Sequence, residues 1–148
     1  GLPESCAPGL SLDHCKGTTI PTPNEVFNIY IDELKDYLMI GSNGSGDPVC
    51  NDLKKNNEIV YLNHDNDFER IYMNSSVHQL TECIIRYKDF YASLDPRFEN
   101  NTFIKRKFLH EEFFQLCQDF IAIDDKCLQD NNCRKAELDY LVWERDNE

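Results

Sequence analysis

The sequence predicts a mainly α-helical fold, an irregular bundle whose helices are linked by disulfides. Three observations predict it: apolar residues recur at helical spacing along four segments, capping motifs precede several of them, and seven cysteines are spread along 148 residues. A chain of this length fits one domain, so residues 1–148 are expected to form a single domain.

The first helix is predicted to begin directly after Thr22. Residues 1–21 lack periodicity and are expected to form an irregular segment tied down by disulfides. Thr22 and Glu25 then form a capping box, with Pro23 at the first helical position. Gly41 is expected to end this helix. Its apolar face follows helical spacing: Val26, Phe27, Tyr30, Ile31, Leu34, Tyr37 and Leu38.

The middle of the chain is less regular. Residues 41–48 are rich in glycine and serine and predict an exposed loop. The next segment is compatible with a short helix over 51–57, a strand over 59–62 and a further helical turn or two over 66–73.

Three further helices are predicted in the second half. Ser76 repeats the capping logic, and its helix should end at Asp95-Pro96, because the residue before a proline is disfavoured in the α region. Thr102 is expected to cap a third, longer helix. A last one should span 134–145, with these residues turned inward: Leu138, Leu141 and Val142.

The cysteines are predicted to form an oxidised framework. No two stand in a Cys-x-x-Cys pair, which disfavours zinc-ribbon and thioredoxin-like sites. Because seven is odd, one thiol is free, pairs with another molecule, or has its partner in a segment missing from the chain. The candidates are Cys6, Cys15, Cys50, Cys83, Cys117, Cys127 and Cys133.

Three N-glycosylation tripeptides support the same compartment. They begin at Asn43, Asn74 and Asn100, each in a polar segment expected at the surface. Together with the cysteines they predict a secreted, extracellular glycoprotein. A mature protein of this kind would have lost its signal peptide.

The formal net charge is −12, from 27 acidic and 15 basic residues. Such a chain is repelled by nucleic-acid phosphates and by anionic membrane surfaces. The run Lys105-Arg106-Lys107 stands alone and is interpreted as a solvated helix face. No stretch approaches the roughly 20 apolar residues that a membrane span needs.

No motif indicates catalysis, a metal or a cofactor. His110-Glu111 begins a zinc-protease motif that fails at Phe114, where the second histidine would have to stand. The residues Asn63, Asp65, Asp67 and Glu69 alternate oxygen donors like half of an EF-hand loop. Phe68 stands where that loop needs glycine, and Asn74 where it needs a closing glutamate. The sequence therefore predicts a non-enzyme.

The second half carries a family resemblance. It comprises Cys83-Ile84-Ile85-Arg86-Tyr87-Lys88-Asp89-Phe90, then Leu116-Cys117-Gln118-Asp119-Phe120, Cys127-Leu128 and Cys133. In these residues, about a third of the chain, it resembles a nematode family of small secreted cysteine-rich helical proteins of unknown function. The resemblance implies a helical, disulfide-linked extracellular domain and brings no catalytic residues. Such domains tend to end with another cysteine, which this chain lacks, and that loss would explain the odd count.

The sequence thus predicts an extracellular binding or interaction protein. Its partner is expected to be another protein, with one unpaired cysteine as a candidate point of attachment. The alternative is a carrier of a small hydrophobic ligand. A cavity lined by Phe27, Tyr30, Phe113 and Phe120 would favour the carrier, whereas a tightly filled core would favour the protein binder.

Overall fold

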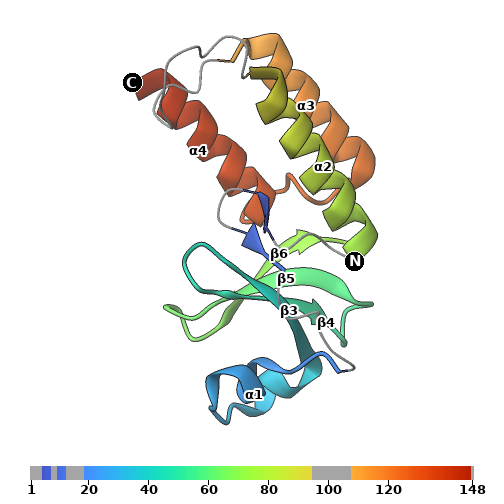
Figure 1. Ribbon diagram of the computed structural model, residues 1–148, viewed down its shortest axis with the longest axis vertical. Coiled ribbons are helices and arrows are strands. Elements are labelled where there is room, and N and C mark those ends of the chain that lie inside the picture. Colours follow the sequence, from blue (N-terminus) through green and yellow to red (C-terminus); the bar gives the residue numbers. More distant parts are fainter. Residues whose placement is uncertain (1–4, 8–9, 13–18, 95–107, 148) are drawn as a thin grey trace.

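The computed structural model describes residues 5–7, 10–12, 19–94 and 108–147. An antiparallel sheet forms one end of the molecule, and three long helices form the other (Figure 1). The fold therefore mixes α and β structure, and the prediction of a mainly helical bundle is wrong. The predicted disulfide linkage is wrong too, because each cysteine whose side chain is described is a free thiol: Cys50, Cys83, Cys117, Cys127 and Cys133.

The sheet is a meander in which each strand pairs antiparallel with the next one along the chain. The short turns between β3 and β6 make this order possible. The strands are β1 (Ser5–Ala7), β2 (Leu10–Ser11), β3 (Tyr37–Asn43), β4 (Pro48–Asp52), β5 (Glu58–Asn63) and β6 (Glu69–Asn74).

Both faces of the sheet are covered. On one face Cys50 lies opposite Met39 and Val60 and packs with them in a buried cluster that includes Leu34. Neighbouring strand residues point to opposite faces, and the second face carries a separate buried cluster: Ile40, Val49 and Ile59, packed with Leu80 and Ile84 of the first long helix. This double burial explains why the strands read as apolar runs without clear alternation.

The first helix begins where the sequence predicts. α1 (Pro23–Phe27) starts after Thr22, whose hydroxyl accepts a hydrogen bond from the Glu25 N–H at 3.3 Å, while the Glu25 carboxylate accepts from the Thr22 N–H at 2.6 Å. The helix ends after five residues, because Asn28 adopts the left-handed conformation with φ 51°. The 3₁₀ turn η1 (Asp32–Asp36) and strand β3 follow, so the predicted long helix is wrong beyond Phe27.

The predicted loop over 41–48 is reduced to a turn over 44–47, because 41–43 belong to β3 and Pro48 begins β4. Gly41 lies within β3 rather than at a helix end, and β2 crosses close beside it. A Cβ atom on Gly41 would stand 1.9 Å from the carbonyl oxygen of Ser11. Glycine is therefore required here by the close approach of two backbones.

The irregular middle segment supplies two strands. The predicted strand over 59–62 is confirmed within β5. The helix considered over 51–57 is wrong, since 53–57 form a turn, and the helical turns considered over 66–73 are wrong, since β6 begins at Glu69.

The long helices agree better with the sequence. α2 (Val77–Leu94) begins after Ser76 as predicted, and α4 (Cys133–Asn147) contains the predicted last helix. α3 (His110–Ile123) begins well after Thr102, the predicted cap, which lies outside the described residues. α2 and α3 lie side by side, with α4 across from them (Figure 1). No described helix has the length and apolar character that a membrane crossing requires.

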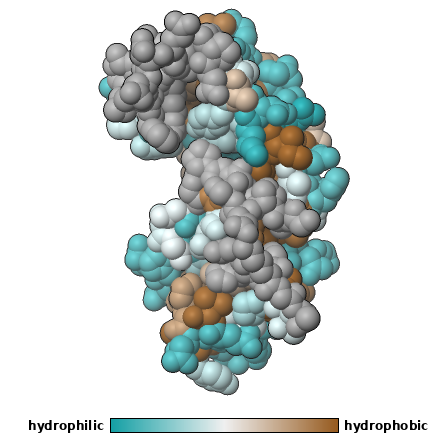
Figure 2. All heavy atoms as spheres, viewed as in Figure 1, coloured by the Kyte–Doolittle hydropathy of each residue, from teal (hydrophilic) through white to brown (hydrophobic). Residues whose placement is uncertain are grey.

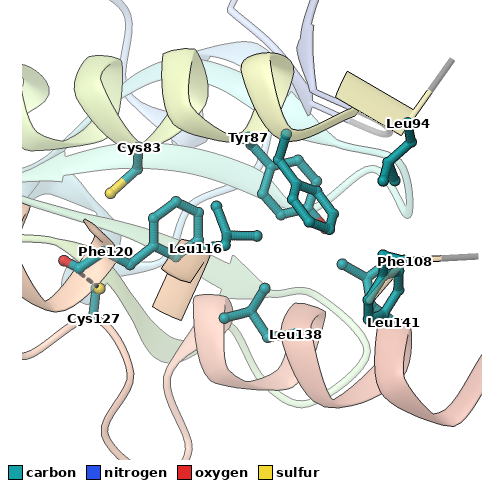
Figure 3. Close-up of a cluster of buried hydrophobic side chains, with 10 residues drawn as sticks. Cys83, Tyr87, Leu94, Phe108, Leu116, Phe120, Cys127, Leu138 and Leu141 are labelled. Atoms are coloured by element: carbon teal, nitrogen blue, oxygen red, sulfur yellow. Dashed lines mark hydrogen bonds between the residues drawn. The ribbon is translucent and has the colours of Figure 1, made fainter. Parts of the chain in front are cut away.

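An aromatic core fills the space between these helices (Figure 3). Tyr87 of α2 stacks on Phe120 of α3, with ring centroids 6.1 Å apart. Leu138 and Leu141 of α4 close the cluster from the other side, as predicted, whereas Val142 is only half-buried.

Candidate functional site

A buried carboxylate joins the sheet to the helices. Asp124 directly follows α3 and accepts hydrogen bonds from the Ser75 N–H (2.7 Å), the Ser75 hydroxyl (2.9 Å) and the Tyr72 hydroxyl (3.0 Å). Asn74 Nδ2 at 3.3 Å and the Lys126 N–H at 3.2 Å add two more. Burial opposes the charge, but the hydrogen bonds outweigh it and lower the pKa of Asp124 below its ordinary value. Asp124 is therefore a charged anchor between the end of β6 and the end of α3.

Two fully buried thiols lie beside this anchor. Cys83 Sγ accepts a hydrogen bond from Asn74 Nδ2 at 3.4 Å, and Cys127 Sγ donates to the Phe120 carbonyl at 3.4 Å (Figure 3). The neighbouring Cys127 thiol lowers the pKa of Cys83, whereas the proximity of Cys83 and burial raise the pKa of Cys127. The positive charge of Arg134 lowers the pKa of Cys83 further.

Arg134 is itself buried at the start of α4. Its Nη1 donates to Glu137 Oε2 at 2.7 Å, while Nε and Nη2 have no hydrogen-bond partner in the described part of the chain. Burial opposes the guanidinium charge, but Glu137 keeps the pKa of Arg134 above its ordinary value. Since Cys83 and Cys127 are also closed to solvent, a solute cannot reach this cluster in the folded protein. Within the cluster, Asn74 connects the end of β6 to Cys83 of α2 and to Asp124.

A second buried carboxylate ties two turns of the sheet to each other. Asp47 accepts hydrogen bonds from Asn43 Nδ2 at 2.7 Å and from the His64 N–H at 3.0 Å, and its Oδ1 lies 2.6 Å from His64 Nδ1. These bonds outweigh the cost of burial and lower the pKa of Asp47. The turn after β3 is thereby fixed to the turn after β5.

The residues considered as calcium ligands lie at the turn between β5 and β6. Two of them accept hydrogen bonds from neighbouring residues of the same segment. Asn63 Oδ1 accepts from the Asp65 N–H at 3.1 Å, and Glu69 Oε2 accepts from Asn66 Nδ2 at 2.6 Å. Among the described residues, no three His, Cys, Asp or Glu side chains lie close enough to hold a metal ion.

Two of the three glycosylation candidates are described. Asn43 is half-buried, and its Nδ2 is the donor to Asp47. Asn74 is fully buried, so the expectation that its segment lies at the surface is wrong. A glycan replaces one of the two Nδ2 hydrogens, so modification of Asn74, whose Nδ2 donates to both Cys83 and Asp124, would remove at least one of these bonds. Asn100 lies outside the described residues, and glycosylation at each site stays a prediction.

The remaining described thiols all have raised pKa values, although only Cys50 is fully buried, whereas Cys117 and Cys133 are half-buried. Burial raises the pKa of Cys50 to about 12 and raises those of Cys117 and Cys133 as well. A protonated, shielded thiol is a poor nucleophile and a poor partner for disulfide exchange. The fully buried thiols are therefore poor attachment points for another protein, and the side chains of Cys6 and Cys15 lie outside the described part of the chain.

An open groove runs between the outer faces of α2 and α3. It has a volume of about 390 Å³, and its floor is formed by Phe90 and Leu116, which are 8% and 3% exposed. Both floor residues belong to the aromatic core, so the floor is rigid. Charged side chains form the rim: Arg86 and Asp89 from α2, and Glu111, Glu112 and Asp119 from α3.

Large apolar side chains are exposed on the same half of the molecule. Phe114 on α3 and Trp143 on α4 are each 59% exposed, and Tyr140 stacks on Trp143 with ring centroids 5.9 Å apart. In Figure 2, brown apolar atoms interrupt the hydrophilic surface over α2 and α3. The helical half thus presents both an acidic groove and exposed apolar rings.

Sequence analysis did not single out Asp47, Asp124 or Arg134. One signal was available for Asp124, because an acid at the C-terminal end of a helix is disfavoured by the helix dipole and needs another reason to be there. Arginine is almost never fully buried unless paired, so a single sequence gives no reason to place Arg134 in the core.

The chain matches no protein-family model, no curated protein and no solved structure. The resemblance to secreted nematode proteins therefore stays a prediction.

Proposed function

We propose that this protein acts by binding another protein through the outer surface of its helical half. The observation that carries the proposal is the exposure of Phe114 and Trp143, with Tyr140 stacked beside Trp143. Tyrosine and tryptophan are enriched among the residues that dominate binding energy at interfaces. Leaving such rings in water forgoes the free energy that their burial would provide, and a partner would recover it.

The polar clusters do not favour an enzyme. Asp124 and Asp47 have their oxygens occupied by fixed donors of the fold. Cys83 and Cys127 are closed to solvent. A catalytic group must come within hydrogen-bond reach of a substrate, which these side chains do not.

No observation favours the carrier of a hydrophobic ligand. Phe113 and Phe120 pack in the aromatic core between the helices, and Phe120 is fully buried there. Phe27 and Tyr30 are exposed beside α1, at the far end of the sheet (Figure 1). The four aromatic side chains that a shared cavity would use are therefore divided between two ends of the molecule.

An extracellular location stays part of the proposal, with less support than the sequence suggested. Proteins of oxidising compartments usually bridge their cysteines, whereas the five described thiols are free. The location now depends on the glycosylation tripeptides.

The native mass of the protein, purified from its natural source, tests the binding function. We expect a mass well above that of the chain and its glycans, which falls to the chain mass on unfolding and releases a second protein. Extra mass of a few hundred daltons would instead identify a small-ligand carrier. A bare chain at every protein concentration would contradict the proposal.

A matched pair of variants locates the surface. Phe114→Ala with Trp143→Ala should abolish the complex, because both side chains lie on the helical half. Tyr30→Ala with Leu53→Ala removes two exposed apolar side chains from the sheet half and should leave the complex intact.

A further inference from the structure

We infer that the groove between α2 and α3 is a docking site for a basic, amphipathic helix of the partner protein. This inference rests on the proposed function and names the partner's chemistry. The groove joins two features: a fixed apolar floor, Phe90 and Leu116, and a rim with four carboxylates against one guanidinium.

The rim charges are not all explained by the fold. Glu111 and Glu112 lie in the first turn of α3, where the helix dipole favours acids, and Glu112 accepts a hydrogen bond from the Leu109 N–H at 2.8 Å. Asp119 lies near the other end of α3, where the same dipole disfavours an acid. Its bond to the Gln115 amide, at 2.9 Å, supplies no positive charge.

Three rim carboxylates have no cationic partner among the described residues. Asp89, Glu111 and Asp119 form no ion pair there, although Arg86 lines the same groove. An acidic rim with unsatisfied charge is complementary to lysine or arginine side chains. Since the whole chain has a formal net charge of −12, its field would also speed the approach of a cationic partner.

The lining of the groove follows two helices, from Arg86 to Ser93 on α2 and from Glu111 to Asp119 on α3, which suits a third helix laid along them. α3 has 14 residues and is therefore about 21 Å long at 1.5 Å per residue. A helix of similar length that lies along α2 and α3 would place one apolar stripe on Phe90 and Leu116 and its basic flanks against the rim. Amphipathic helices bind hydrophobic grooves in this way, through apolar anchors spaced three and four residues apart.

A model peptide tests this site directly. The probe is a fluorescent leucine–lysine peptide of about the length of α3, with leucines at helical spacing, and its leucine–glutamate counterpart is the first control. Fluorescence anisotropy should show that the intact protein binds the lysine peptide and not the glutamate peptide. The affinity should fall as salt rises, because ions screen the rim charges.

Two double variants that remove the same number of negative charges distinguish binding in the groove from attraction by the net charge of the whole protein. Asp89→Asn with Asp119→Asn should weaken binding about tenfold, because two charge pairs at the rim are lost. Glu33→Gln with Asp67→Asn removes the same charge from exposed positions at the sheet end and should leave the affinity unchanged. Equal losses in both variants would overturn the inference, since only the net charge would then matter.

A variant with reversed rim charges tests whether a loss of binding comes from unfolding, because it should gain a new ligand. Asp89→Lys with Asp119→Lys should bind the glutamate peptide and reject the lysine peptide. If spermine displaces the lysine peptide as well as its charge alone would predict, the groove binds small polycations in general. That result would overturn the inference. A wild-type protein that ignores the lysine peptide also overturns it, whereas the native mass experiment decides the binding function independently.

Discussion

Five hydrogen-bond donors converge on the carboxylate of Asp124, which belongs to neither the sheet nor a helix. Two of them come from Ser75, at the start of the segment that leads into α2. Removing the charge would leave buried donors facing a weaker acceptor, and unsatisfied buried groups cost more than the bond itself contributes. At the residue scale, the stability of the junction depends on this one side chain.

Asp124→Asn is expected to lower the free energy of unfolding by about 3 kcal/mol, because the amide keeps one acceptor oxygen and turns an N–H₂ group toward donors. Urea unfolding followed by circular dichroism measures the change. Asp125→Asn, the same substitution at the exposed neighbouring residue, should stay within about 0.5 kcal/mol of wild type. Equal effects would mean that the hydrogen bonds of Asp124 contribute nothing particular to stability.

The difference in unfolding free energy between wild type and Asp124→Asn should also depend on pH. The pKa of Asp124 is lower in the folded protein than in the unfolded chain, where it is about 3.9. Its contribution is therefore complete above about pH 4 and is lost as the pH falls through the folded-state pKa. The difference in unfolding free energy between wild type and Asp124→Asn should narrow below about pH 4. Because Asp47 is present in both proteins, its own acid titration cancels in the comparison.

At the scale of elements, local signals predicted where α1 and α2 begin, but of the strands they indicated only the one over 59–62. The capping box at Thr22 and the start of α2 after Ser76 depend on neighbouring residues, and both are confirmed. Tyr37 and Leu38 also fit helical spacing, but they pair with residues of β4. Strand pairing depends on a partner elsewhere in the chain, which the spacing of one segment does not reveal.

Gly41 shows, at a single residue, the same limit of prediction from one segment of sequence. The sequence suggested a helix end, whereas the structure uses the missing side chain to let β2 approach β3. We expect Gly41→Ala to lower the free energy of unfolding by at least about 2 kcal/mol, because the new methyl group meets the backbone of Ser11. Thermal unfolding measures this effect.

Gly46→Ala is the matched control. Gly46 has a φ of 86° and open space around it, so an added methyl group should cost only about 1 kcal/mol of backbone strain. If both substitutions cost the same, β2 does not lie as close to Gly41 as described.

At the scale of the whole molecule, cysteine counting led to the wrong scaffold. An oxidised framework was expected from the number and spread of the cysteines, whereas a sheet with two covered faces supplies buried clusters that need no cross-links. Five cysteines then act as small apolar side chains or hydrogen-bonding groups rather than as cross-links. The groove and the buried anchors could not be predicted from the sequence either, because each joins residues from separate elements.

Alkylation tests this view of the cysteines. In urea without reductant, iodoacetamide should modify Cys50, Cys83, Cys117, Cys127 and Cys133 completely, as peptide mass mapping would show. In the native protein, Cys50, Cys83 and Cys127 should resist, because they are fully buried. A parallel sample reduced before alkylation is the control. Any of the five that reacts in urea only after reduction would reveal a disulfide that this structure lacks.

The meander order of the sheet bears on how the chain folds during synthesis. From β3 to β6 every pairing closes a turn of a few residues, so little loop entropy opposes it. These strands can therefore pair as soon as residue 74 has left the ribosome, before α3 and α4 exist. Asp124 is made 50 residues after Asn74. Its arrival would fix the end of β6 to the end of α3 before α4 is made, and a ribosome paused between the two positions would hold paired strands that still lack this anchor.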